Sequence, residues 1–224
     1  MSAMGDSDRG AYGVVLKGVS KTIKGKRVLD DVSVQFPAGK VSGIRGPNGS
    51  GKTMLLRAVA GLLAIDNGSV DVLGERVGGT GAFPPSMGFL IEPMGFWDEF
   101  TGRENLEMLA SIRGKVGPQE VARTLARVGL DPRDTRRVGA YSLGMRQRLG
   151  IAQALMESPR LLLLDEPTNA LDEDGKDLVA RIIAEERSRG ITVIVVSHDL
   201  PELDRISDVQ YRMSEGRIEG VRER

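Results

Sequence analysis

The stretch Gly46-Pro47-Asn48-Gly49-Ser50-Gly51-Lys52-Thr53 decides the fold, because it fits the phosphate-binding pattern G-x-x-x-x-G-K-[ST]. Its glycines allow successive backbone N–H groups to point inward at an anion. Lys52 is then expected to reach the β- and γ-phosphates, and the Thr53 hydroxyl to coordinate Mg²⁺. The stretch predicts a nucleoside triphosphate site whose binding residues are Asn48, Gly49, Ser50, Gly51, Lys52, Thr53 and Met54.

The flanks of this loop have the context that such a site needs. Residues 40–45 are typical of a short strand, and residues 54–60 of a helix. A helix that begins at the end of the loop adds its dipole to the phosphate site. An ordinary glycine-rich turn would not require strand, loop and helix in this order.

Composition narrows the class of protein. The chain has 224 residues, which suits one domain carrying a subdomain. Its 31 basic and 31 acidic residues balance, so nothing indicates a nucleic-acid partner. Cysteine is absent, which excludes disulfides and thiolate metal sites. The longest apolar runs are strand-sized, so a separate protein is expected to provide any membrane-spanning part.

Hydrophobic periodicity predicts an α/β domain interrupted by a helical insertion. Residues 1–11 are expected to form a flexible tail, and 75–86 a loop. Within the insertion, Val121, Leu125 and Val128 share a helix face between Pro118 and Gly129. Strand-like patterns cover 12–36, 69–74, 87–91, 160–165, 191–197 and the hairpin 213–218, and residues 174–189 form an amphipathic helix.

A second group of candidate catalytic residues follows the apolar strand Leu161–Leu164. Asp165 and Glu166 come directly after it, at the strand end where open α/β sheets bind ligands. Asp165 is suited to hold Mg²⁺ through water, and Glu166 to polarise the water that attacks the γ-phosphate. A plain strand-ending turn is the alternative, and the phosphate loop upstream favours the catalytic interpretation.

Three further motifs complete an ordered set. Tyr141-Ser142-Leu143-Gly144-Met145-Arg146-Gln147-Arg148 precedes the paired carboxylates, and Thr168-Asn169-Ala170-Leu171-Asp172 and Ser197-His198-Asp199 follow them. From about Val14 to Ile218 the chain resembles the ATP-binding-cassette (ABC) ATPases. The resemblance implies a P-loop NTPase with a RecA-like mixed-sheet core, an N-terminal antiparallel β subdomain and a helical subdomain at about 93–157, in one domain spanning 12–224.

The resemblance also implies how the site residues work. Two cassettes face each other head to tail, so Ser142 and Gly144 of one subunit bind the γ-phosphate held by the phosphate loop of the other. Asp172 couples the two sites. His198, the single histidine of the chain, contacts the γ-phosphate and holds Glu166 and the water in position. The implied catalytic residues are Lys52, Glu166 and His198, and the cofactors are ATP and Mg²⁺.

Some positions depart from the pattern of the family. Glu92 stands where most relatives have a glutamine near Mg²⁺, which adds a negative charge beside the γ-phosphate and predicts an altered metal dependence. Ile23 stands where an aromatic residue usually stacks on adenine, which predicts weak base selectivity. Residues 141–145 correspond to the signature sequence of the family, and Leu143 replaces a glycine of that sequence. The metal ligands implied for this chain are Thr53, Asp165 and Glu92.

The motif variants resemble one branch, the ATPases of bacterial exporters for bacitracin and lantibiotics. This branch implies an ATPase subunit of an exporter on the cytoplasmic face of the membrane, without nucleic acid. Its partners are a transmembrane permease, contacted by the Glu92 loop and by the helical block of residues 101–157, and a second nucleotide-binding subunit, expected as a homodimer. The alternatives are a soluble ABC ATPase acting on ribosomes or DNA, and a regulator that binds nucleotide without turnover. The transported substrate does not follow from this sequence.

Overall fold

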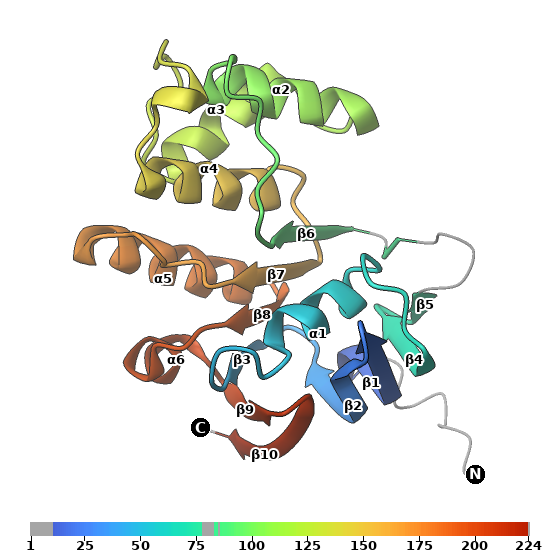
Figure 1. The fold of residues 1–224 in the computed structure, drawn as a ribbon. Helices are drawn as coiled ribbons and strands as arrows, with labels where there is room; N and C mark the ends of the chain where they lie inside the picture. The colour runs from blue at the N-terminus through green and yellow to red at the C-terminus, as the bar shows by residue number, and fades with distance from the viewer. Residues whose placement is uncertain (1–10, 78–82, 85, 224) are drawn as a thin grey trace.

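The computed structural model describes residues 11–77, 83–84 and 86–223, which form two β-sheets with helices between and beside them (Figure 1). The smaller sheet is antiparallel throughout and has the strand order β2-β1-β4-β5. Its strands are β1 (Tyr12–Ile23), β2 (Lys26–Pro37), β4 (Asn67–Val72) and β5 (Glu75–Val77).

The larger sheet has the order β10-β9-β3-β8-β7-β6. It is parallel except for the edge strand β10, which pairs with β9 in antiparallel orientation. Every residue of β7 and β8 is buried, which explains why their sequences are continuous apolar runs. The strands are β3 (Val41–Arg45), β6 (Met87–Leu90), β7 (Leu161–Asp165), β8 (Thr192–Val196), β9 (Val209–Ser214) and β10 (Arg217–Glu223).

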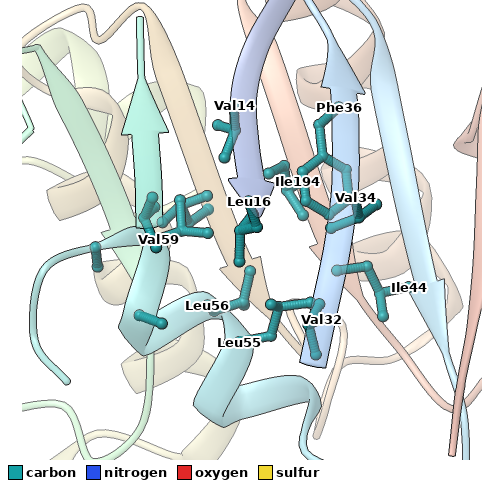
Figure 2. Close-up of a cluster of buried hydrophobic side chains, with 14 of the residues drawn as sticks. Val14, Leu16, Val32, Val34, Phe36, Ile44, Leu55, Leu56, Val59 and Ile194 are labelled. Carbon is teal, nitrogen blue, oxygen red and sulfur yellow. The ribbon is translucent and has the colours of Figure 1, made fainter. Parts of the chain in front are cut away.

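Helix α1 (Lys52–Val59) lies between the two sheets (Figures 1 and 2). Its Leu55 and Leu56 are fully buried against side chains of β1, β2, β3 and β8, which include Leu16 and Ile44 (Figure 2). Burial of each such leucine contributes about 1.5–3 kcal/mol. The phosphate loop is therefore held between β3 and a helix that is fixed on both sides.

Three α-helices lie between β6 and β7 in sequence: α2 (Gly102–Arg113), α3 (Pro118–Arg127) and α4 (Leu143–Leu155). Thr101 and Glu104 form a capping box at the start of α2. Helix α3 begins at Pro118 as predicted, and Gly129 (φ +75°) follows its end. Two more helices, α5 (Glu173–Ser188) and α6 (Leu200–Ile206), follow β7 and β8. Among the residues that the structure describes, no helix is both long and apolar enough to cross a membrane.

The predicted α/β architecture with an antiparallel subdomain and a helical insertion is confirmed, with one local correction. The loop predicted for 75–86 is wrong at its start, where β5 pairs with β4. The turn between them uses Gly74 at φ +85°, and the ion pair Arg76–Asp71 (2.8 Å) joins the two strands. Residues 78–82 and 85 of that loop, and residues 1–10 of the predicted tail, lie outside the described part of the chain.

Tyr211 on β9 is expected to make the stability of the fold decrease at alkaline pH. Its side chain is 3% exposed, and its hydroxyl donates a hydrogen bond to the Gln35 carbonyl at 2.7 Å. Burial raises the pKa of Tyr211 to about 12. An unfolded tyrosine ionises near pH 10. The contribution of Tyr211 to the free energy of unfolding is therefore complete below that pH and is lost as pH rises toward 12. Relative to Tyr211→Phe, the free energy of unfolding of the wild type should fall by about 2 kcal/mol over this range.

Urea denaturation of both proteins at pH 8, 10, 11 and 12 measures this difference. Loss of the hydrogen bond in the variant adds a constant offset of about 1 kcal/mol, which does not depend on pH below 10. Parallel pH profiles for the two proteins would contradict the assignment.

Candidate active site

The phosphate loop joins β3 to α1 and closes around the Lys52 side chain. Lys52 is 7% exposed, and its ammonium group donates to the carbonyls of Gly46 (2.7 Å) and Pro47 (3.1 Å). Gly51 precedes the helix at φ +105°, and a Cβ atom there would lie 2.5 Å from the Val28 carbonyl oxygen. A side chain at this position would therefore force the loop away from β2. The fold thus places a nearly buried cation inside a loop next to a helix N-terminus.

Thr53 and Asp165 meet across the site. The Thr53 hydroxyl donates to Asp165 Oδ2 at 2.7 Å, and Asp165 is 7% exposed. Burial raises the pKa of Asp165, as do the Glu166 and Glu92 carboxylates, whereas Thr53 and Lys52 oppose the rise. A second cation beside Asp165 would relieve this accumulation of negative charge.

The donor set fits Mg²⁺. A hydroxyl and one or two carboxylates next to a phosphate loop are the oxygen ligands that this ion takes, together with water and phosphate oxygens. In residues 11–77, 83–84 and 86–223 no group of three or more acidic or histidine side chains could hold a metal by itself. Glu92 is exposed and lines one cavity together with Thr53 and Asp165. Its carbonyl oxygen accepts a hydrogen bond from the Arg57 side chain at 2.7 Å.

Glu166 and His198 lie at the ends of the neighbouring strands β7 and β8. The Glu166 amide donates to the Val196 carbonyl at 2.8 Å, and its Oε2 lies 2.8 Å from His198 Nδ1. The same oxygen accepts from the His198 backbone N–H at 3.3 Å. The His198 side chain is 65% exposed and that of Glu166 is 24% exposed, so both reach solvent. A carboxylate held by a histidine beside a phosphate loop has the geometry of a general base.

One cavity of about 740 Å³ collects most of the predicted binding residues. Ser50 is absent from its lining; its hydroxyl is buried and has no hydrogen-bond partner among the described residues. Four lining residues were not predicted as binding residues: Lys24, Lys26, Val28 and Asn169. The first three follow closely after Ile23, the position predicted to face the base, and that proximity was a signal for them. The lining is Ile23, Lys24, Lys26, Val28, Asn48, Gly49, Gly51, Lys52, Thr53, Met54, Glu92, Asp165, Glu166 and Asn169.

Ser142, Gly144 and Asp172 line a second cavity, of about 580 Å³, and His198 is in the lining of neither cavity. Ser142 caps α4 by accepting a hydrogen bond from the Met145 amide at 3.2 Å, and Gly144 lies in the first turn of that helix. Asp172 caps α5 through the Gly175 amide (2.9 Å) and lies 3.6 Å from an Arg148 nitrogen. The two cavities share no lining residue, so Ser142 and the phosphate loop line different cavities of the chain.

Comparisons with known proteins agree with this site. The family model described as "ABC transporter" matches residues 29–169. The chain is 41% identical over 201 residues to the uncharacterized ABC transporter ATP-binding protein YybJ of Bacillus subtilis (strain 168), covering 90% of this chain and 92% of that protein. It is also similar to the bacitracin transport ATP-binding protein BcrA of Enterococcus faecalis, with 35% identity over 92% of this chain and 68% of that protein. The lantibiotic transport ATP-binding protein SrtF of Streptococcus pyogenes is 34% identical over 91% of this chain and 87% of its own length.

The fold has close counterparts among solved structures. The dimeric structure of the bacterial ABC transporter cassette MJ0796 superposes with a TM-score of 0.85 at 24% identity, covering 94% of this chain and 98% of that chain. The family resemblance predicted from the ordered motifs is confirmed, including its branch. The chain therefore belongs to the ABC transporter family, in which it is an ATP-binding subunit with ATPase activity.

Proposed function

We propose that this subunit powers export through a separate transmembrane permease, by ATP-driven closure of two copies of the chain. The observation that carries the proposal is the division of the site into two cavities. One contains Lys52, Thr53 and Glu166, and the other contains Ser142 and Asp172. A head-to-tail pair would join each cavity to its complement, with ATP between them. Hydrolysis would then reopen the pair.

Within each joined site, Glu166 accepts the proton of the attacking water, and His198 orients the γ-phosphate. Lys52 and the N–H groups of the loop stabilise the transferred charge. Thr53 and Asp165 would hold Mg²⁺, with Glu92 a third contributor, and the ion would supply positive charge next to the phosphates. Ser142 and Gly144 bind the γ-phosphate of the partner's ATP, and Asp172 couples the two sites.

The permease contact is proposed for the Glu92 loop and the helical block around it, in a single domain that spans residues 12–224. Trp97 (44%) and Phe100 (40%) are large apolar side chains exposed in this segment. Exposed aromatic side chains grouped on one segment are typical of a binding surface. Similarity to BcrA and SrtF, whose names specify bacitracin and lantibiotic transport, supports the exporter assignment and a place on the cytoplasmic face of the membrane.

A pull-down of this chain from detergent-solubilised native membranes tests the transporter function. We expect one multi-pass membrane protein in stoichiometric amount, lost in Trp97→Asp. Val221→Asp is the matched control, because Val221 is 58% exposed on β10, outside the helical block. Ribosomes or DNA-bound proteins in place of the membrane protein would favour a soluble ABC ATPase.

Glu92→Gln is expected to raise the Mg²⁺ concentration for half-maximal ATPase activity by roughly threefold to tenfold. The neutral amide removes one negative charge from a cavity that also contains Asp165 and Glu166. An exposed ionic interaction of this kind contributes about 1 kcal/mol. A Mg²⁺ titration of both proteins measures the shift, with Glu219→Gln as the control, because that carboxylate pairs with Arg212 and is not in the lining of the cavity. Superimposable curves for Glu92→Gln and wild type would remove Glu92 from the metal site.

A further inference from the structure

We propose that Glu202 is a positioning residue that locks the Ser197–Asp199 loop, and with it His198, onto the segment that carries Glu166. The inference rests on the proposed hydrolytic role of Glu166 and His198. Glu202 is not in the lining of the nucleotide cavity, so it would act through these neighbours.

One carboxylate oxygen of Glu202 joins the two loops. Oε2 accepts a hydrogen bond from the Thr168 hydroxyl at 2.7 Å and another from the Ser197 hydroxyl at 3.2 Å. Thr168 lies two residues after Glu166, and Ser197 comes directly before His198. Both hydroxyl residues are nearly buried, with exposed fractions of 7% and 1%. Since water cannot easily replace a buried acceptor, loss of the carboxylate would leave the O–H groups of Thr168 and Ser197 without this acceptor.

Two further hydrogen bonds hold the Ser197–Asp199 loop. The Ser197 hydroxyl also accepts from the Asp199 amide at 3.0 Å, and Asp199 Oδ1 accepts from the Glu202 amide at 3.2 Å. Ser197, Asp199 and Glu202 thus form a ring of hydrogen bonds at the start of α6. His198 lies between Ser197 and Asp199 in the chain, so these hydrogen bonds fix the position of its backbone.

This support matters because the His198 side chain has little packing of its own. It is 65% exposed, and its ring contacts Glu166 Oε2 at 2.8 Å. Burial raises the pKa of Glu202, with Asp199 and Glu166 adding to the rise and the two hydroxyls opposing it. Burial of a carboxylate lowers the free energy of unfolding. We therefore expect Glu202 to contribute to the geometry of the site more than to the stability of the fold.

The experiment compares Glu202→Met with Glu202→Gln. Met has a similar length but no acceptor for the hydroxyls, whereas the amide oxygen of Gln still accepts from Thr168 and Ser197. We expect Glu202→Met to lower kcat about tenfold or more with KM for ATP within twofold of wild type, since positioning of a general base affects the chemical step. Glu202→Gln should recover most of this loss.

The matched control is Glu104→Met. Glu104 also accepts a hydrogen bond from a threonine hydroxyl near a helix start, at 2.8 Å from Thr101, but in α2. We expect it to lower the melting temperature and leave kcat unchanged. An equal loss of kcat in Glu104→Met, or wild-type kcat in Glu202→Met, would overturn the inference.

A second measurement does not depend on turnover. His198 is the only histidine, so selective ¹³C and ¹⁵N labelling gives a single imidazole spectrum. In the full-length protein without nucleotide, Glu202→Met should move its ¹³Cε1 and ¹⁵Nδ1 signals toward those of a free histidine, and Glu104→Met should not. Unmoved signals would overturn the inference. Absence of ATPase activity in the wild type would instead overturn the proposed function, and the imidazole spectrum would still test whether Glu202 positions His198.

Discussion

Glu166→Gln is expected to reduce ATP turnover by about 10²- to 10⁴-fold while ATP still binds, because the amide cannot accept the proton of the attacking water. The substitution preserves the size of the side chain and keeps an oxygen that can accept from the His198 backbone N–H. Lys52, Thr53 and Asp165 are unchanged, so the affinity for Mg–ATP should be retained. The loss would therefore be in kcat.

A trapped dimer is the second expected result for this variant. If ATP closes two copies of the chain and hydrolysis reopens them, Glu166→Gln with ATP should sediment as a dimer, and the wild type mainly as a monomer. Phosphate release and analytical ultracentrifugation measure the two effects. Glu185→Gln on α5 is the control, because that carboxylate pairs with Arg127 outside both cavities. Wild-type turnover in Glu166→Gln would remove Glu166 from the role of base.

The parts of the site that sequence analysis predicted are those in which neighbouring residues act together. The phosphate loop is one contiguous stretch, and Asp165 and Glu166 are adjacent at a strand end. Pro118 and Gly129 mark α3 because proline fixes φ at the first helical position, and glycine readily adopts the positive φ that follows the helix end. These features need no knowledge of how distant segments pack.

The supporting contacts could not be predicted in this way. Gln147 is 3% exposed on α4, and its side-chain amide donates to the Glu166 carbonyl at 2.9 Å. Glu202 reaches Thr168 across 34 positions of sequence. The contact of Glu202 exists because the parallel strands β7 and β8 place their carboxyl ends side by side. The contact of Gln147 depends on how α4 packs against β6 and β7. Strand β5 was missed for another reason: it is three residues long and begins with Glu75 and Arg76, so it lacks apolar alternation.

Gly88→Ala is expected to destabilise the fold by about 3 kcal/mol, the upper range for inserting a group into a packed interior. Gly88 lies in β6, where α4 packs against the strand, and a Cβ atom there would overlap the Ala154 carbonyl oxygen. It would also lie 3.0 Å from Pro159 Cγ. Because Ala154 belongs to the backbone of α4, relief requires the helix to shift on the sheet. The sequence predicts a strand here but does not indicate that a helix approaches this residue.

Thermal unfolding followed by circular dichroism tests this prediction. A loss of about 3 kcal/mol corresponds to a fall of roughly 6–12 °C in the melting temperature of a chain of this size. Gly95→Ala is the matched control, since a Cβ atom at Gly95 would meet nothing within 4 Å. It should change the melting temperature by about 2 °C or less, as exposed substitutions usually do. Equal melting temperatures for the two variants would show that α4 does not pack against β6 as closely as described. Helix α4, with Ser142 at its start, would then be free to move relative to Glu166.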